Sequence, residues 1–417
     1  MYRHVAGSRS THVRLVVLAL RNVTLLVAFL VIASGCSASN EAAKDDSDPT
    51  ANTVAGRVDV ERLCADDIQT FRTDIASDGN RVSDAQLNLL DADVSDVALS
   101  DTPEWVVPYG DDGSWYVTLR SGNAVVIAPD GSVADATPVP AGDAPELLAT
   151  SADDIRVESA LKDQRLFDDP LPDARIVKSG DIWAALTRPT DRYDHGVLAD
   201  AVEASAIEIV DTCTGNVTVI DVPEPEVIEG ISPILADVDG DDEVEVVVTI
   251  SNPRNGARLV VYDLDGTFLA ESSAIGKRNR WRNQLAVAPL GPKGETEIVD
   301  VRVPHLGGVV EFFRLEGNTL NKQAEISEFT SHVIGTRNLD MGIVVDATGD
   351  DRLNVVVPTQ ARTELAVIVR ENDAANVVGA VEVGGKVVTN ISAQRLPSGG
   401  AVAVGSDGNY VRIWQTP

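Results

Sequence analysis

The feature that most constrains this chain is an acidic loop between two apolar, β-rich runs. Asp237, Asp239 and Asp241 alternate through the loop, Gly240 permits a tight bend, and Glu245 follows four residues after Asp241. Carboxylate oxygens at this spacing are typical of a calcium-binding loop. A weaker copy lies further along the chain, with Asp346, Thr348, Asp350 and Asn354 at the corresponding positions. The loop therefore belongs to a repeated unit.

The repeat is clearest in the second half of the chain. Each unit has an apolar run, a loop and two further apolar runs, and a fourth run is visible where a turn such as Asp265-Gly266 precedes it. The loops begin near Asp237, Leu290, Asp346 and Leu396, at intervals of about 50 to 56 residues. Four strands in a unit of this length are the sequence signature of a β-propeller blade.

The predicted fold is therefore all-β, a single β-propeller that spans residues 57–417. Short β-rich runs separated by Gly, Asp, Asn and Pro fill this span, with few amphipathic helices. Its length predicts about seven four-stranded blades, with six or eight possible. The last unit stops after its third strand. We therefore expect an N-terminal strand near residues 57–63 to supply the fourth and close the ring, which would leave no long free sheet edge.

The acidic loops resemble those of FG-GAP/VCBS repeat propellers, the class that includes the integrin alpha-chain head. The resemblance covers residues 229–417 well and residues 100–228 loosely. In that family the oxygen ligands come from the first, third, fifth and ninth loop positions. The resemblance thus implies calcium ligands at Asp237, Asp239, Asp241 and Glu245, and at Asp346, Thr348, Asp350 and Asn354.

The two loops differ in how well they match this pattern. The second departs from it at two positions, and the loop at Leu290 has lost the ligands altogether, so the blade does not require a metal in every unit. Calcium here is expected to be structural and not catalytic. The alternative for both acidic loops is a solvated turn, because Asp and Gly favour turns without any ion.

The N-terminus has the pattern of an export signal at residues 1–35. An apolar run at 23–32, too short for a comfortable membrane span, separates four arginines from small residues. The small residues before Cys36 resemble a bacterial lipoprotein processing site, although Ala33 stands where that family more often has Leu. By this resemblance Cys36 carries lipid and anchors the chain at the outer face of the cytoplasmic membrane or at the cell surface. The alternative is an ordinary signal peptide with an incidental cysteine.

Residues 36–56 are small, polar and acidic, which predicts a flexible tether. Two further cysteines remain, Cys64 and Cys213, and in an exported chain they are a plausible disulfide. Sequence alone does not show that they meet.

The charge of the chain limits its partners. The formal net charge is −31, and removal of the four arginines in residues 1–35 would make it −35. This argues against nucleic acid and against electrostatic docking on anionic lipid, so we expect contact with a membrane only through the lipid anchor. The simplest reason for the acidity is solubility.

The candidate residues for ligand chemistry lie in loops of the predicted blades. His195 and His305 fall between second and third strands, whereas His332 and the basic stretch 277–284 fall between blades. Because strands in a blade alternate in direction, all of them should lie on the face opposite the acidic loops. The full candidate set is Arg192, Tyr193, His195, Arg280, Trp281, Arg282, His305, His332 and Arg337.

We expect the four arginines of this set to form a cationic mouth for a small anionic ligand, with the aromatic rings for stacking and the histidines as hydrogen-bonding or acid–base groups. The alternative is that each histidine is structural and each arginine pairs with one of the many acids. The separation of the histidines gives no spacing signal for a transition metal.

The sequence contains no motif for a named reaction, such as a phosphate-binding glycine loop, His-Glu-x-x-His or a nucleophile elbow. It therefore favours an exported module that binds a small anionic ligand or a protein partner. The alternative is a propeller enzyme, similar to a sugar dehydrogenase or a lyase, that uses the histidine and arginine face.

Overall fold

The computed structural model describes residues 78–110, 112–138 and 166–416. The chain divides into two compact units, Met1–Thr53 and Val54–Pro417, and every described residue belongs to the second. The predicted signal peptide, the tether and Cys36 lie outside the described residues. Within the described ranges, no helix has the length and apolar character needed to cross a membrane.

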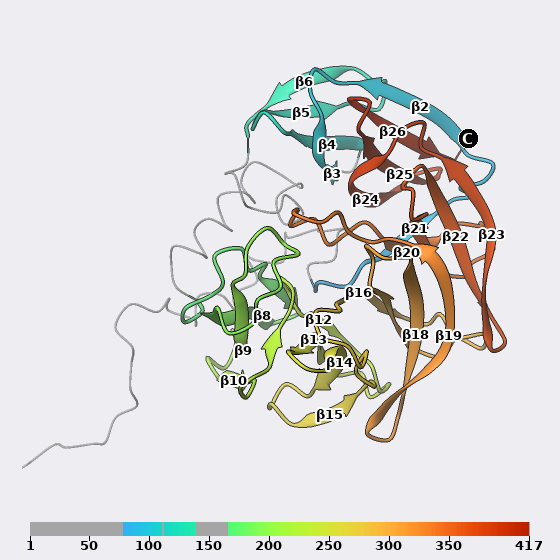
Figure 1. The fold of residues 1–417 in the computed structure, drawn as a ribbon. Helices are drawn as coiled ribbons and strands as arrows, with labels where there is room; N and C mark the ends of the chain where they lie inside the picture. The colour runs from blue at the N-terminus through green and yellow to red at the C-terminus, as the bar shows by residue number, and fades with distance from the viewer. Residues whose placement is uncertain (1–77, 111, 139–165, 417) are drawn as a thin grey trace, which may run out of the picture. The chain divides into compact units, whose positions relative to one another are not determined.

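Six units of four antiparallel strands, three of them joined in one 13-stranded sheet, make up most of the described chain (Figure 1). We call each unit a blade and name it by its strands. The first blade consists of β3 (Pro103–Tyr109), β4 (Ser114–Leu119), β5 (Ala124–Ile127) and β6 (Val133–Ala136). The second consists of β7 (Val177–Ser179), β8 (Ile182–Thr190), β9 (Glu203–Asp211) and β10 (Val217–Asp221). The third consists of β12 (Ile234–Ala236), β13 (Glu245–Asn252), β14 (Gly256–Tyr262) and β15 (Phe268–Glu271).

The remaining three blades follow in chain order. The fourth consists of β16 (Arg282–Ala288), β17 (Glu297–Arg302), β18 (Gly308–Glu316) and β19 (Thr319–Phe329). The fifth consists of β20 (Ile343–Asp346), β21 (Asn354–Pro358), β22 (Glu364–Glu371) and β23 (Ala374–Glu382). The sixth combines β24 (Val387–Leu396), β25 (Gly399–Ser406) and β26 (Tyr410–Gln415) with β2 (Asp93–Ala98) from much earlier in the chain.

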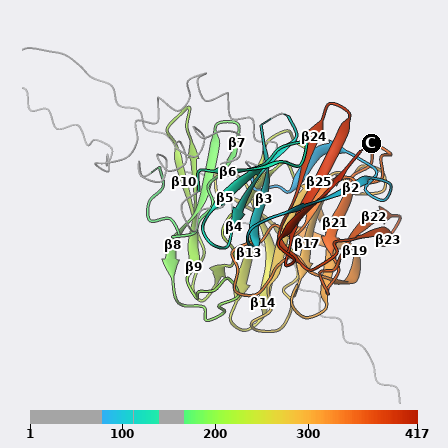
Figure 2. The same cartoon turned by 90° about the horizontal axis from the view of Figure 1, so that it is seen from above.

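Short links join neighbouring blades. β11 (Val227–Ile228) pairs with both β9 and β13, and a single parallel bridge connects Glu271 of β15 with Thr319 of β19. The first strands of consecutive blades also contact one another: β12 contacts β16, β16 contacts β20, β20 contacts β24, and β24 contacts β3. Figure 1 shows the blades following one another around a common centre, and Figure 2 shows them after a turn of 90°.

Burial explains why the apolar runs differ along a blade. β13 is buried at almost every position, and Val246–Val248 have 0% of their surface exposed, because neighbouring strands and blades cover both faces. β23 forms an outer edge and alternates between exposed and covered positions along most of its length. A run of consecutive valines and isoleucines thus marks an inner strand, whereas alternation marks an outer one.

The architecture is that of a β-propeller, as the sequence predicted. Six blades can be counted in the described residues, and the total of about seven and the closure of the ring stay predictions. The strand that completes the last blade was placed wrongly. β2 pairs with β26 along its whole length, from Asp93 opposite Gln415 to Ala98 opposite Tyr410, so the added strand is 93–98 and not 57–63. Its alternating Asp and Val residues suit an exposed outer strand.

A segment at residues 78–91 lies along the inner strands of several blades. The carbonyl of Asp78 accepts a hydrogen bond from the backbone amide of Leu235 in β12. The side-chain amide of Asn80 donates to the carbonyl of Val287 in β16 and accepts from its backbone N–H. β1 (Val82–Gln86) then pairs in parallel with β20 and contacts β24. This segment, which we call the axial segment, therefore occupies the centre that the inner strands surround.

The axial segment is also part of the core. Leu87 and Leu89 are almost completely buried and pack with Val356, Val404 and Trp414 from the last two blades. Burial of one such leucine stabilises the fold by roughly 2 kcal/mol. The segment is thus a structural element of the propeller.

Candidate functional site

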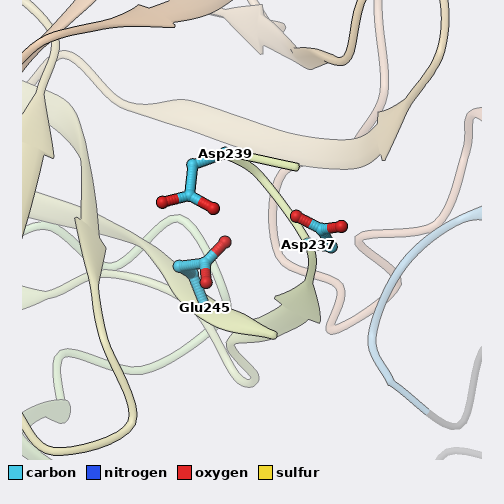
Figure 3. A group of neighbouring side chains, drawn as sticks. All are labelled: Asp237, Asp239 and Glu245. Carbon is cyan, nitrogen blue, oxygen red and sulfur yellow. The ribbon is translucent and has the colours of Figure 1, made fainter. Parts of the chain in front are cut away.

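The acidic loop between β12 and β13 brings three carboxylates together. Oxygen atoms of Asp237, Asp239 and Glu245 all lie within 4.8 Å of one another, and Figure 3 shows the three carboxylates around a common point. Asp237 accepts a hydrogen bond from the amide of Gly240 at 2.6 Å, which folds the loop back on itself. Asp241, the fourth predicted ligand, is not one of the three and accepts a 2.8 Å bond from the Glu243 amide.

The electrostatics of this group favour a cation. Burial, together with the charges of Asp239, Asp241 and Asp237, raises the pKa of Glu245 to about 7, against the opposing hydrogen bond from the Val238 amide. None of the three clustered carboxylates forms an ion pair with a lysine or arginine in the described part of the chain. Hard carboxylate oxygens suit a hard cation such as calcium.

The second acidic loop has the same backbone structure. Each of its positions lies 109 residues after its counterpart, and the residue with positive φ in one, Asp242 at 70°, matches Asp351 at 63° in the other. Four amide-to-side-chain hydrogen bonds are also common to both loops. In the first loop they run from Val238 to Glu245, from Gly240 to Asp237, from Asp242 to Asp237 and from Glu243 to Asp241. In the second they run from Ala347 to Asn354, from Gly349 to Asp346, from Asp351 to Asp346 and from Arg352 to Asp350.

The two loops differ in charge at their centre. The hydroxyl of Thr348 lies 2.8 Å from a carboxylate oxygen of Asp350 and 3.2 Å from the amide oxygen of Asn354, so it can donate to one of them. Thr348 and Asn354 take the places of Asp239 and Glu245, which removes two negative charges. Within the described residues, only the first loop forms a group of three carboxylates that could hold a metal ion.

A third blade fills the corresponding position in another way. Glu297 opens β17 as Glu245 opens β13, and its side chain is fully buried. Arg314 donates to it at 2.8 Å, and Arg370 of the next blade donates at 2.9 and 3.1 Å. A carboxylate at this position is thus neutralised by two guanidinium groups where the blade has no acidic loop.

On the opposite face, two histidines form a chain of hydrogen bonds. His332 Nε2 lies 2.7 Å from the carbonyl of Thr336, and His332 Nδ1 lies 2.7 Å from His305 Nε2. A carbonyl can only accept, so His332 carries its proton on Nε2, accepts from His305 through Nδ1, and leaves His305 Nδ1 with a free lone pair. Burial lowers the pKa of both histidines to about 4, and the charges of His332 and His195 contribute for His305.

The third histidine is oriented by a buried carboxylate. His195 Nδ1 donates to Glu229, whose other oxygen accepts from the Ser251 hydroxyl. Trp281 links the two parts, because its indole nitrogen donates to the Glu229 carbonyl at 3.2 Å and its ring stacks on His305. Tyr193 contacts the His195 ring edge-on at 5.8 Å between ring centres. The predicted histidines and aromatic residues therefore gather in space, and their functional role stays a prediction.

Glu229 was missed by the sequence analysis. A single glutamate in a chain with 65 acidic residues has no distinguishing signal, and its partner His195 is 34 residues away. Ser251 was missed for the same reason.

The predicted cationic mouth does not form as expected. Arg192 donates to backbone carbonyls of Val222 and Glu226, and Arg282 is buried against Asp300 at 2.7 Å. Arg337 pairs with Asp173 and Asp200, each at 2.7 Å. The physical reason is that a guanidinium removed from water needs acceptors, and this chain supplies many acids. Arg280, which donates to the Asn279 carbonyl at 2.7 Å, and Arg192 thus have backbone acceptors and no acid partner in the described residues, whereas Arg282 and Arg337 are paired with carboxylates.

A small cavity lies beneath Trp281, between the axial segment and the inner strands. Its lining includes Arg81, Arg175 and Asp340, and the aspartate pairs with both arginines. The volume open to the centre of a water molecule is about 20 Å³. The cavity can therefore hold one or two water molecules and is too small for a sugar.

Cys213 is disulfide-bonded. Its predicted partner Cys64 lies outside the described residues, so the pairing itself stays a prediction.

Comparison with known proteins gives no family. No protein-family model matches the chain, and no curated protein matches it. Among solved structures, the propeller domain of Myceliophteria thermophila Cps50 (Swd1) is 11% identical, with 78% of this chain and 100% of that chain covered and a TM-score of 0.43.

Two further solved structures are similar at the same level. Quinohemoprotein alcohol dehydrogenase from Comamonas testosteroni is 11% identical, with 81% of this chain and 80% of that chain covered and a TM-score of 0.41. Chaetomium thermophilum Raptor is 9% identical, with 80% of this chain covered and a TM-score of 0.41, and the match spans only 30% of the Raptor chain. Function is therefore argued from the residues of this chain.

Proposed function

We propose that this chain is an exported, lipid-anchored β-propeller that acts as an interaction module and holds a structural calcium ion in the loop from Asp237 to Glu245. The pattern of an export signal at residues 1–35 and the resemblance of the residues before Cys36 to a lipoprotein processing site support the location at the outer face of the cytoplasmic membrane or at the cell surface. The acidic loops and their repeat support a relationship with FG-GAP/VCBS propellers.

The main support for the calcium site comes from comparing the first residue of the second strand in three blades. Where the second strand of a blade begins with Glu297, two guanidinium groups bind the carboxylate, and where it begins with Asn354, the group is neutral. At Glu245 a buried carboxylate lies beside two aspartates, and no cationic side chain of residues 78–110, 112–138 or 166–416 pairs with it. A calcium ion supplies there the charge that arginines supply in the next blade.

The experiment is a calorimetric titration of calcium into the chelated protein, with thermal unfolding in chelator and in calcium. We expect one site, a higher unfolding temperature with calcium, and loss of both effects in the Asp239→Asn variant. Asp350→Asn, at the neutral loop, is the matched control and should keep both effects. Absence of calcium heat together with an unchanged unfolding temperature in the unsubstituted protein would remove the calcium site from the proposal.

An interaction module suits the opposite face better than a small-molecule pocket. The axial segment occupies the centre of the blades. In the cavity beneath Trp281, the centre of a water molecule can move through only about 20 Å³, so the cavity is too small for a sugar. All four candidate arginines donate to groups of this chain, two of them to carboxylates. A protein partner needs no deep pocket, because interfaces are formed by extended surfaces with a few anchoring side chains.

One observation favours the alternative, a propeller enzyme similar to a sugar dehydrogenase or a lyase. His195 is held by the buried carboxylate of Glu229, an arrangement that orients an imidazole for acid–base chemistry. If this role is correct, His195→Gln should abolish turnover of a sugar or sugar-acid substrate without changing the unfolding temperature. If a screen of such substrates finds no turnover by the unsubstituted protein, the enzyme alternative is rejected and the interaction module is the function that remains.

A further inference from the structure

Two basic loops pack against each other on the face opposite the acidic loops. They are the turn from β13 to β14 at residues 252–256 and the connection from β15 to β16 at residues 276–281. The amides of Gly276 and Lys277 both donate to the carbonyl of Asn255, at 2.7 and 3.1 Å. Gly256 is needed for this packing, since a Cβ there would lie 2.3 Å from the Lys277 carbonyl oxygen. The two loops thus form one continuous surface.

This surface is basic in a strongly acidic protein. It carries Arg254, Lys277, Arg278 and Arg280, and neither loop contains an acidic residue. Arg254, Lys277 and Arg278 are exposed, Arg280 is half-buried, and none of the four pairs with an acid in the described ranges. We call these four residues the basic patch.

The basic patch gathers four cations on two contacting loops. Among the other exposed arginines of the described residues, Arg188 and Arg395 each pair with an aspartate, whereas Arg120 and Arg352 are single cations on separate loops. Four neighbouring cations without an acid repel one another, and an acidic chain of net charge −31 could readily have supplied partners. An external anion would relieve this repulsion.

Two exposed apolar side chains lie next to the basic patch. Leu306 is 64% exposed and Ile334 is 62% exposed, the largest values among the exposed large apolar residues of the described chain. Their loops are joined by the hydrogen bond between His305 and His332, and the ring of Trp281, which follows the basic patch, stacks on His305. The cationic and apolar groups therefore share one surface, as at many protein interfaces.

We infer that this surface binds an acidic polypeptide segment that also carries apolar side chains. Carboxylates of the segment contact the basic patch, and its apolar side chains cover Leu306 and Ile334. The inference rests on the proposed function as an interaction module, and it names the surface and the chemistry of the partner. It does not depend on calcium, because the acidic loop and the basic loops lie at opposite ends of β13.

The observations favour a polypeptide over an anionic bilayer. A bilayer is a plane that would meet the whole face, including the exposed Asp191 and Asp194, and Asp194 lies beside the patch because its carbonyl accepts from Asn279. A polypeptide segment is narrow enough to contact the patch alone. The electrostatic field of a chain with net charge −31 also repels an anionic bilayer more strongly than it repels a single acidic segment.

The acidic loop at residues 239–243 of a second copy is a poor match for this surface. The exposed acidic loop at residues 239–243 is complementary to the basic patch in charge, but it contains no large apolar side chain. Contact with that loop would leave Leu306 and Ile334 uncovered.

The test measures fluorescence anisotropy of a labelled peptide of repeated Glu-Glu-Leu with the purified full chain in calcium. Binding should weaken as salt rises from about 0.05 to about 0.5 M, because screening shortens the range of surface charges. The double variant Lys277→Ser/Arg278→Ser should weaken it roughly tenfold. The matched control Arg188→Ser/Arg395→Ser removes two exposed cations elsewhere and should change it less than about twofold.

A second variant tests the apolar part of the surface. Leu306→Ser/Ile334→Ser should weaken binding of the Glu-Glu-Leu peptide roughly fivefold and leave a Glu-Glu-Ser peptide unaffected, since only the leucines lose contacts. A peptide of repeated Lys-Lys-Leu should not bind. Equal binding by the basic-patch variant and its control would overturn the inference.

Two other occupants have distinct outcomes. Co-sedimentation with phosphatidylglycerol vesicles that depends on the basic patch, without peptide binding, would show that the surface binds lipid. Sedimentation velocity that finds an oligomer in the unsubstituted chain and a monomer in the basic-patch variant would show a second copy. Either result would overturn the inference. Calcium stabilisation, measured in the same samples, is expected in every variant, so its loss would count against the proposed calcium site and not against this surface.

Discussion

The sharpest prediction exchanges the centres of the two acidic loops. In the double variant Asp239→Thr/Glu245→Asn the first loop receives the two residues that the second loop has at Thr348 and Asn354. The backbone of both loops is the same in its amide hydrogen bonds and its positive φ positions, so the exchanged residues should fit. We expect the variant to fold without calcium and to gain nothing from it.

The magnitude follows from charge and mass action. Unsubstituted protein should gain about 2.7 kcal/mol of unfolding free energy when calcium is a hundredfold above its dissociation constant. In chelator the same protein has three carboxylates within 4.8 Å, and part of this repulsion is already relieved because the pKa of Glu245 is raised to about 7. Removal of two of these charges should therefore stabilise the chelated protein by about 1 to 2 kcal/mol.

The assay is guanidinium unfolding at pH 7.5, in chelator and in calcium. The reciprocal variant Thr348→Asp/Asn354→Glu is the matched control, and it should become less stable in chelator and acquire stabilisation by calcium. If the first variant still gained as much from calcium as the unsubstituted protein, the assignment of the ligands would be wrong. If it lost stability in chelator, the argument from carboxylate repulsion would be refuted.

Three further predictions concern other parts of the fold. Arg370→Met should lower the free energy of unfolding by about 3 kcal/mol in guanidinium unfolding, because it strips a partner from the fully buried Glu297; a loss below about 1 kcal/mol would contradict this. The contribution of His305 and His332 to the free energy of unfolding should fall between pH 6.5 and pH 4, since unfolded chains protonate these histidines below about 6.5 and the folded protein does so only near 4; it is measured as the difference between the unsubstituted protein and the variant His305→Gln/His332→Gln. Urea midpoints at several pH values check this, and the double Gln variant should flatten the curve; an unchanged slope would contradict it. Gly256→Ala should cost about 2 kcal/mol in thermal unfolding, because φ is +74° and its Cβ would meet a carbonyl oxygen of the neighbouring basic loop; an unchanged unfolding temperature would contradict that packing.

The architecture could be predicted because each blade repeats a local pattern. Apolar runs that alternate with Asp- and Gly-rich turns specify strands and hairpins from neighbouring residues alone, and the acidic loop fixed which connection lies on which face. Strand order predicted that His195, His305 and Trp281 share one face, and in the structure Trp281 stacks on His305 and donates to the carbonyl of Glu229, the partner of His195. The strand β2 was misplaced because its partner β26 lies at the other end of the chain, and no local signal identifies such a pairing.

The state of each charged group could not be predicted. Arg280 and Arg282 flank Trp281 in the sequence. Arg282 is buried against Asp300, whereas Arg280 has no acid partner in the described residues. Their difference depends on whether the side chain points into the blade or toward the surface, which is set by contacts between distant segments. The same holds for Glu229, whose partners come from two other loops.

What the sequence alone determined is the repeated unit, the strand order within it and the carboxylates of its acidic loop, because these depend on periodicity and spacing along the chain. What only the tertiary structure decided is the axial segment in the centre, the group of three carboxylates at Asp237, Asp239 and Glu245, and the separation of paired arginines from the basic patch. The physical reason is that burial and ion pairing are properties of neighbours in space. In this propeller those neighbours come from different blades.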